Sequence, residues 1–377
     1  MHRPEKWFPL KVLVCESCWL VQAESYSRAA ELFNDEYAYF SSFSSLWLAH
    51  AESYVANMIE RLQLTKDSFV VEVAANDGYL LQYFQKKGIP NLGIEPTAST
   101  ASAARLKGIE ILEEFFGVNI AKDLIRQGKQ ADLMTANNVL AHVPDINDFV
   151  KGFSILLKPN GIATFEFPHL MNLIAQKQFD TIYHEHFSYL SFGTVVEIFK
   201  KTGLPVFDVE EFPTHGGSLR VYAQRTDTGM HPVRKRVSDL LHKEEKANMK
   251  TIAYYQGFQE QANKIKYDFL TFLLEANRQG KRVAAYGAAA KGNTLMNYAG
   301  IKPDLISFVV DRNPSKQNKF MPGSRIPIVD ENHLKLVKPD YVVIIIWNLK
   351  SEIIQQLDYI RSWGGKFVTA VPQLEII

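Results

Sequence analysis

The sequence predicts an α/β protein in which two Rossmann-like domains follow a short N-terminal lobe. Short apolar runs alternate with helical segments along most of the chain, and this alternation is typical of parallel sheets. Two of these runs, at residues 69–73 and 283–287, lead into small-residue turns that open helices. A chain of 377 residues is also too long for one ordinary core. We expect an N-terminal lobe over residues 1–46, a central domain over 47–207 and a C-terminal domain over 208–377.

The elements can be assigned in order from the spacing of apolar residues. The first helix is expected over residues 47–62, where apolar side chains recur at helical spacing. The strands of the central domain are expected at residues 69–73, 92–94, 133–136 and 162–167. The C-terminal domain is expected to start with a strand at 219–222 and a long helix from about 237 to 278. Its later strands are expected at residues 283–287, 306–310 and 341–346.

The composition points to a globular protein whose main partner is a small molecule. Lys and Arg total 42 against 41 Asp and Glu, so no excess charge would attract nucleic acid or an anionic membrane. No apolar run approaches the ~20 residues that span a bilayer, and the first residues lack the apolar region of a signal peptide. Cys15 and Cys18 are the two cysteines, which excludes a disulfide scaffold. We expect a cytoplasmic monomer or homodimer.

The first small-residue turn, VVEVAANDG at residues 70–78, suggests a site for S-adenosylmethionine. The common pattern for this methyl donor is an acidic residue followed by three alternating glycines. Here Glu72 and Gly78 are present, whereas Ala74 and Asn76 replace glycines. Small residues still let a ligand approach the backbone, and Asn tolerates a left-handed conformation better than most side chains.

Two further elements follow the turn at the spacing that a nucleoside site requires. Glu95 ends the next predicted strand, where a carboxylate would bind the ribose hydroxyls. Asn137 and Asn138 begin the loop after the strand at 133–136, which in methyltransferases faces the methionine part. The alternative is a generic α/β turn with a surface glutamate. We expect the donor to contact Glu72, Ala74, Asn76, Gly78, Tyr79, Glu95, Asn137 and Asn138.

The string YHEHFSYL at residues 183–190 carries the densest group of acid–base side chains. C-methylation beside a ketone needs a base for the carbon-bound proton and a donor for the enolate oxygen. A neutral histidine suits the first role near pH 7, and a tyrosine or a second histidine suits the other. Two alternatives stay open: His-x-His with a carboxylate could ligate a metal, or one histidine could be a hydrogen-bonded core residue.

Five strings along the chain resemble the sugar C-methyltransferases that act on nucleotide-linked 4-keto-6-deoxyhexoses in deoxysugar pathways. The strings are YAYFSSFS at 37–44, VEVAANDGYL at 71–80, YHEHFSYLS at 183–191, THGGSLR at 214–220 and YGAAAKGNT at 286–294. The resemblance covers nearly the whole chain. It implies a methyl-donor domain and a C-terminal Rossmann-like domain with the sugar nucleotide between them.

The resemblance also implies residue roles and one departure. The catalytic histidine of the family falls on His186, with Tyr183 and Glu185 as its neighbours, and the family methylates C3 beside the C4 ketone. The family has an N-terminal zinc-binding lobe that uses two Cys-x-x-Cys pairs, whereas this chain carries only Cys15 and Cys18. Two thiolates cannot fill a tetrahedral site, so zinc would need ligands from elsewhere, such as His2. The lobe is therefore expected to be an incomplete remnant.

The C-terminal strings and the first aromatic string supply the expected contacts to the sugar nucleotide. Backbone amides, a hydroxyl and a guanidinium in THGGSLR suit an anionic diphosphate, and Lys291 is a further candidate charge partner. The alternative is that His215 and Arg220 stabilise the domain joint and that Lys291 is a solvated helix-start residue. The expected substrate contacts are Tyr37, Tyr39, His215, Gly217, Ser218, Arg220, Lys291 and Asn293.

The sequence therefore predicts an S-adenosylmethionine-dependent C-methyltransferase of a nucleotide-linked keto-sugar. A nicotinamide-dependent oxidoreductase of a sugar nucleotide is one alternative, although the second turn lacks the spaced glycines that pyrophosphate binding needs. A non-catalytic protein that retains the methyltransferase fold is the other alternative.

Overall fold

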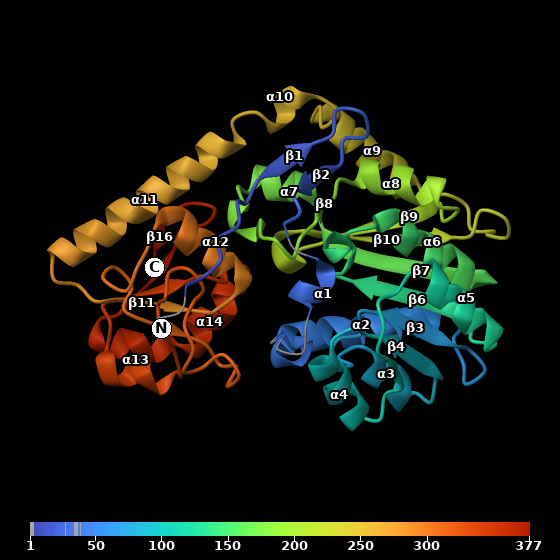
Figure 1. The fold of residues 1–377 in the computed structure, drawn as a ribbon, viewed down its shortest axis with the longest axis horizontal. Helices are drawn as coiled ribbons and strands as arrows, with labels where there is room; N and C mark the ends of the chain where they lie inside the picture. The colour runs from blue at the N-terminus through green and yellow to red at the C-terminus, as the bar shows by residue number, and fades with distance from the viewer. Residues whose placement is uncertain (1–3, 27, 34–36, 38) are drawn as a thin grey trace.

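The computed structural model of the chain describes residues 4–26, 28–33, 37 and 39–377. Within this part, three sheets define a small N-terminal lobe, a central α/β domain and a C-terminal α/β domain. The central and C-terminal domains lie side by side, and a helical segment arches over both of them (Figure 1). No helix in the described ranges combines the length and the apolar composition that a membrane crossing requires.

The N-terminal lobe is a β-hairpin that adds to a short strand of the central region. β1 (Val12–Val14) pairs antiparallel with β2 (Val21–Ala23), and β2 pairs with β8 (Ser188–Tyr189). Cys15 and Cys18 lie in the hairpin turn as free thiols. The hairpin therefore pairs with Ser188 and Tyr189, which belong to the string YHEHFSYL at residues 183–190. A short helix, α1 (Ala29–Leu32), leads toward the central domain.

The central domain contains a seven-stranded sheet in the order β5-β4-β3-β6-β7-β10-β9. Five strands run parallel, and β10 lies antiparallel between β7 and β9. The strands are β3 (Val70–Val73), β4 (Asn91–Ile94), β5 (Ile111–Leu112), β6 (Ala131–Asn137), β7 (Leu157–Pro168), β9 (Val206–Phe212) and β10 (Ser218–Gln224). The strand order reverses direction between β3 and β6, and this switch point is where ligands bind in open α/β sheets.

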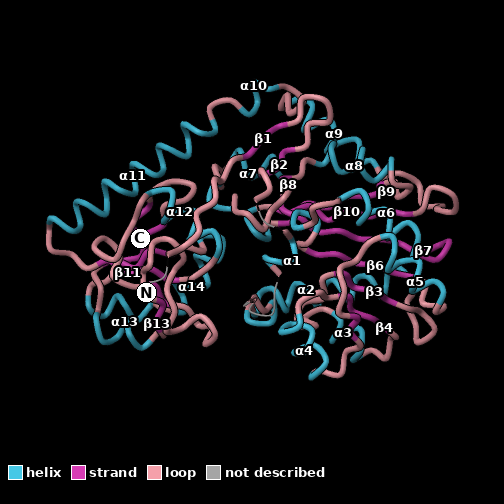
Figure 2. Tube along the Cα trace, viewed as in Figure 1, coloured by secondary structure: helices cyan, strands magenta, loops and turns pink. Residues whose placement is uncertain are grey.

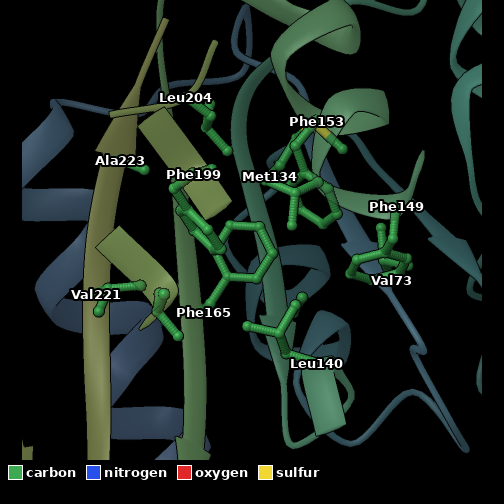
Figure 3. Close-up of a cluster of buried hydrophobic side chains, with 14 of the residues drawn as sticks. Val73, Met134, Leu140, Phe149, Phe153, Phe165, Phe199, Leu204, Val221 and Ala223 are labelled. Carbon is green, nitrogen blue, oxygen red and sulfur yellow. The ribbon is translucent and has the colours of Figure 1, made fainter. Parts of the chain in front are cut away.

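Helices cover both faces of this sheet because strand residues alternate between the two sides. Met134 faces a cluster with Phe153, Phe165 and Phe199, which Figure 3 shows, whereas Leu133 faces the opposite cluster. The helices are α2 (Ser45–Leu62), α3 (Leu81–Lys86), α4 (Ala98–Leu106), α5 (Val118–Arg126), α6 (Ile146–Leu156), α7 (Leu170–Ala175) and α8 (Phe192–Lys201). Two buried apolar layers thus hold the sheet rigid beneath the site.

The sheet extends past the domain boundary that the sequence predicted. The expected boundary at residues 207 and 208 falls inside β9, and the strand expected to open the C-terminal domain is β10, which pairs with β7. The central sheet therefore ends at Gln224. A local apolar pattern identifies a strand but contains no information about its partner, so this difference arises from long-range pairing.

The long helix expected from about 237 to 278 is divided into three. α9 (Lys235–Lys246), α10 (Ile252–Tyr255) and α11 (Phe258–Arg278) follow one another along the arch, as the tube in Figure 2 shows. Gly257 has a φ of 82°, a left-handed conformation that ends one helix and lets the next begin.

The C-terminal domain is a second α/β unit with the strand order β13-β12-β11-β14-β15-β16. All neighbouring strands are parallel except the last pair. The strands are β11 (Val283–Tyr286), β12 (Val309–Val310), β13 (Ile328–Val329), β14 (Tyr341–Ile344), β15 (Lys366–Thr369) and β16 (Glu375–Ile376). Its helices after α11 are α12 (Ala290–Ala299), α13 (Asn332–Val337) and α14 (Lys350–Gln356). The prediction of two Rossmann-like α/β domains is confirmed.

Candidate active site

The turn after β3 adopts the backbone conformation that its small residues suggested. Ala74, Asn76 and Gly78 have φ values of 58°, 50° and 73°, so three alternating residues are left-handed. A Cβ at Gly78 would overlap Ile109 Cδ1 and crowd the Ala104 Cβ, so the Ile109 side chain would have to move to admit a larger residue. The alternating left-handed residues form a tight turn at the switch point of the sheet, where small side chains let a ligand approach the backbone.

Glu95 ties this turn to the end of β4. One carboxylate oxygen accepts the Asn76 N–H at 2.9 Å, and the other accepts the Thr97 N–H at 3.0 Å. Burial raises the pKa of Glu95, while the hydrogen bonds from these backbone amides oppose that shift. The carboxylate thus stands at the carboxyl ends of β3 and β4, where the sequence predicted a ribose-binding acid.

Several buried polar atoms around the turn have no hydrogen-bond partner among the described residues. They include both carboxylate oxygens of Glu72 and the side-chain oxygens of Asn137 and Asn138. Glu72 is fully buried, and burial holds its pKa well above the usual range. Tyr79 lies beside Glu72 and Asn137. Buried polar atoms without a hydrogen-bond partner are rare unless a ligand completes them. This set of acceptor oxygens therefore fits a polar nucleoside with an amino-acid moiety.

The N-terminal segment covers the turn through its backbone. The Asn76 side chain accepts the Ser41 N–H at 2.9 Å and donates to the Tyr39 carbonyl at 3.1 Å. The Ser99 hydroxyl donates to the Tyr37 carbonyl at 3.1 Å. Tyr37 and Tyr39 were expected to contact the substrate. They lie instead over the turn at residues 74–78, which is called the donor turn because the methyl donor is expected to bind there. The Tyr39 side chain remains half exposed.

His186 is held as a neutral base with a defined tautomer. Its Nδ1 lies 3.0 Å from the Thr181 carbonyl oxygen. A carbonyl only accepts hydrogen bonds, so Nδ1 carries the proton and Nε2 keeps its lone pair. Burial lowers the pKa of His186 well below its usual value, and the neighbouring His142 lowers it further.

Aromatic rings pack directly against the His186 imidazole. The ring centroids of Tyr183 and His142 lie 4.1 and 4.6 Å from that of His186. Burial raises the pKa of Tyr183 well above its usual range, so its hydroxyl stays protonated and can donate. His142 comes from η2 (Leu140–His142) after β6, and burial lowers its pKa to about 4.

His142 is a site residue that the sequence reasoning missed. It lies in the loop that was already assigned to the donor site, but a single histidine five residues after a strand gives no signal of its own. Its Nδ1 has no partner among the described residues. Only the fold shows that this loop meets the histidine string.

The histidine string forms a turn, and its side chains point in different directions. The His186 N–H donates to the Tyr183 carbonyl at 3.0 Å. His184 turns away and makes a 3.0 Å hydrogen bond to the Pro9 carbonyl of the N-terminal lobe. Burial raises the pKa of Glu185, although the Lys316 charge and a hydrogen bond from Tyr37 both act to lower it. The metal alternative gains no support, because no cluster of three ligating side chains occurs in the described ranges.

Arg220 does not lie free for a phosphate as the sequence suggested. Its Nη2 donates to Glu166 at 2.8 Å and lies 3.0 Å from His50 Nε2, and the guanidinium lies over Tyr54 and Phe212. Glu166 is fully buried, so the two charges neutralise one another inside the domain. Arg220 also borders a cavity of about 640 Å³ between α2, β9, β10 and α9.

The rest of the THGGSLR string forms a tight turn beside the site. η4 (Thr214–Gly216) holds His215 at a φ of 54°, and its ring stands edge-on to Trp47 with centroids 4.9 Å apart. Burial lowers the pKa of His215 to about 4. The Gly217 carbonyl accepts the His169 N–H at 3.0 Å, and the Ser218 hydroxyl donates to the Thr214 carbonyl.

Lys291 and Asn293 enter the site from the C-terminal domain at the start of α12. Lys291 Nζ donates to the Asn348 side chain at 2.7 Å and lies 4.6 Å from the centre of the Trp347 ring. The Lys291 charge contributes to the lowered pKa values of both His186 and His215. The Asn293 side-chain oxygen has no partner among the described residues. The fold thus brings His186, His215 and Lys291 together from separate parts of the chain.

The cysteine pair does not form a metal site with other described residues. Cys15 and Cys18 occupy the β1–β2 turn, and no third His, Cys, Asp or Glu joins them in the described ranges. His2 lies outside the described residues. Two ligands do not fit a tetrahedral structural zinc site.

The donor turn gives a first testable prediction. Gly78→Ala should lower the free energy of unfolding by about 2–4 kcal/mol and abolish donor binding, because the left-handed backbone and the overlap with Ile109 both add cost. Gly88→Ala is the matched control, since Gly88 has a φ of 68° but no heavy atom within 4 Å of the added Cβ. Urea unfolding and calorimetry with S-adenosylmethionine measure both effects. Equal stability and donor affinity in the two variants would contradict the close packing of this turn.

Family comparisons cover nearly the whole chain. A methyltransferase domain model matches residues 47–209, and a C-methyltransferase C-terminal domain model matches residues 213–372. A zinc-binding domain model matches residues 1–33. The match over residues 213–372 favours the methyltransferase over the oxidoreductase alternative for the C-terminal half.

The chain is also similar to individual proteins. The C-methyltransferase NovU of Streptomyces niveus is 33% identical over 373 residues, which cover 99% of this chain and 88% of NovU. A ubiquinone biosynthesis O-methyltransferase of Bordetella avium (strain 197N) is 31% identical over 98 residues, 26% of this chain and 41% of that protein. Magnesium protoporphyrin IX methyltransferase of Synechocystis PCC 6803, solved with bound S-adenosylmethionine, has a TM-score of 0.36 and 14% identity, covering 47% of this chain and 79% of its own. The chain belongs to the C-methyltransferase family and is an S-adenosylmethionine-dependent C-methyltransferase.

Proposed function

We propose that this enzyme methylates C3 of a nucleotide-linked 4-keto-6-deoxy sugar through an enolate, as a step of deoxysugar biosynthesis. The observation that carries the proposal is the state of His186, which presents an unprotonated Nε2 while Nδ1–H is held by Thr181. A methyl acceptor carbon must first lose a proton, and the carbon beside a ketone is acidic enough for an imidazole to deprotonate. A buried neutral histidine is the side chain that this step requires.

The residues around His186 support an enolate. His186 Nε2 would remove the proton from the carbon next to the ketone, and the electron pair would spread onto the carbonyl oxygen. The protonated Tyr183 hydroxyl can donate a hydrogen bond to that oxygen, and the nearby Lys291 ammonium adds positive charge. His142 helps to keep the base neutral, since two imidazoles in contact resist double protonation.

S-adenosylmethionine supplies an electrophilic methyl group on a positively charged sulfur. In the protein, the Glu95 carboxylate at the end of β4 would accept hydrogen bonds from the ribose hydroxyls. The orphaned oxygens of Glu72 and Asn137 would receive donors from the amino-acid moiety, and the left-handed turn at Gly78 would allow the close approach. The carbon that His186 deprotonates would take up this methyl group, and the neutral thioether of the methyl donor would be the leaving group.

The sugar nucleotide is proposed to lie between the central and C-terminal domains. Lys291 is the cationic group there, and Asn293 offers an unpartnered oxygen. His215 and Gly217 in the turn around η4 are proposed to face the sugar nucleotide from the central domain, with Tyr37 and Tyr39 on the side of the methyl donor. Ser218 is fully buried and is proposed to support this turn through its hydrogen bond to the Thr214 carbonyl. Arg220 is left out of this set because the buried Glu166 carboxylate already neutralises its charge.

Product analysis tests the proposal. The protein is incubated with S-adenosylmethionine and a panel of nucleotide-linked 4-keto-6-deoxyhexoses, and the products are examined by mass spectrometry and NMR. We expect one sugar to gain a single methyl group on carbon. Folded protein that binds the donor but leaves every member of the panel unchanged would refute the proposed substrate class.

The lowered pKa of His186 gives a pH prediction. An ordinary histidine base loses half of its activity near pH 6.5, because that is its usual pKa. Burial shifts the pKa of His186 downward, so its neutral form persists at lower pH. We expect kcat/KM to stay constant from pH 8 down through pH 6.5 and to fall only at lower pH. A half-maximal rate at pH 6.5 or above would contradict a desolvated base.

A further inference from the structure

The segment that carries the base docks on the C-terminal domain, although it belongs to the central domain in sequence. η3 (Phe179–Thr181) lies between α7 and β8. Phe179 is buried in the apolar cluster of the C-terminal domain, and its ring centroid lies 5.4 Å from that of Tyr298. A short turn from one domain is thus part of the core of the other.

Two hydrogen bonds from the C-terminal domain hold the same turn. Trp347 Nε1 donates to Asp180 Oδ2 at 2.8 Å, and the Thr294 hydroxyl donates to the Ile182 carbonyl at 2.7 Å. Asp180 is fully buried, so its hydrogen bond is shielded from competing water. Burial raises the pKa of Asp180 to about 6, while the Lys291 charge and the indole N–H oppose the shift.

Thr181 lies between these contacts, and its carbonyl is the acceptor that defines the His186 tautomer. The residues on both sides of Thr181 are therefore bonded to the C-terminal domain. Trp347 also presses on η4, because a Cβ at Gly216 would lie 2.6 Å from its ring. One indole thus contacts both walls of the site.

We infer that Trp347 is a positioning residue for His186, and that it acts through Asp180 and the Thr181 carbonyl. The indole N–H fixes Asp180, the adjacent carbonyl then stays aligned with His186 Nδ1, and Nε2 keeps its lone pair toward the site. Without this bond the carbonyl can move, and the imidazole can rotate or change tautomer. The inference rests on the proposed role of His186 as the base.

Trp347→Phe tests the inference because it removes the N–H but keeps an aromatic ring. Loss of a group that orients a catalytic ligand or base typically costs about 10–100-fold. We expect kcat to fall by about this factor while the affinity for S-adenosylmethionine is unchanged. Trp363→Phe is the matched control, since the Trp363 indole donates to the Pro339 carbonyl within the C-terminal domain. This control should keep the wild-type kcat.

Nitrogen NMR of labelled histidines reads the tautomer directly and does not depend on turnover. The His186 signals are assigned by their loss in His186→Asn. We expect Nδ1–H in the wild type and in Trp363→Phe, and a mixture of tautomers in Trp347→Phe. An unchanged tautomer and kcat in Trp347→Phe would overturn the inference. If the proposed function fails, the wild type shows no turnover with the sugar panel, yet the tautomer change still reports on positioning.

Discussion

Replacement of His186 by asparagine is expected to lower turnover by roughly 10²–10⁴-fold while S-adenosylmethionine still binds. The variant loses Nε2, the nitrogen whose lone pair is proposed to take the proton. An asparagine amide can still donate to the Thr181 carbonyl, so the 3.0 Å hydrogen bond that holds the turn has a replacement. The donor turn follows β3 and is held by Glu95 at the end of β4. These contacts do not involve His186. Single-turnover kinetics and donor calorimetry separate the two effects.

His184→Asn is the matched control for this prediction. His184 stands two residues earlier in the same string, but it bonds to the Pro9 carbonyl of the N-terminal lobe. We expect its turnover to stay within a few-fold of the wild type. If His186→Asn retained a near-normal rate, or if His184→Asn lost as much activity, the base would have to be another group.

The second large effect is expected on stability. Arg220→Met should lower the free energy of unfolding by about 3–5 kcal/mol, because it leaves the fully buried Glu166 carboxylate without its main counter-charge. Burial alone would raise the pKa of Glu166, but His50 and Arg220 hold it below its usual value. Methionine fills much of the same space, so lost charge rather than a cavity dominates. Urea unfolding at pH 7 measures the change.

Arg361→Met is the control for an arginine whose removal should cost little. Arg361 pairs with Asp358 at 3.2 Å, and the two side chains are 46% and 70% exposed. We expect a loss of at most ~1 kcal/mol. If Arg220→Met had the same free energy of unfolding as this control but failed to bind the sugar nucleotide, Arg220 would instead bind the diphosphate, as the sequence suggested.

Much of the fold follows from local patterns. The buried strand before the turn at Ala74 and the acid at Glu95 form half of the proposed nucleoside site, and parallel pairing brings them to one edge. The strand and turn at 283–287 similarly identify a second α/β unit. These features depend on alternation and spacing, which a single sequence displays. The roles of His186 and Tyr183 came from the family resemblance together with the acid–base chemistry of the string.

Long-range pairing accounts for what could not be predicted. Nothing near Arg220 in the sequence indicates that Glu166 lies opposite, because the two meet only when β10 pairs with β7. The same pairing carries the central sheet past the expected boundary, as far as Gln224. His142 and Trp347 join the site through loops of different domains, and neither position has a local signature.

Solvent deuterium exchange reports directly on whether His186 removes the proton from the carbon beside the ketone. The sugar nucleotide is incubated with the enzyme in D₂O without S-adenosylmethionine, and the carbon beside the ketone is followed by NMR. We expect deuterium at that carbon with the wild type and none above background with His186→Asn. Equal exchange with both proteins, or none with a wild type that forms the methylated product, would contradict proton removal by His186.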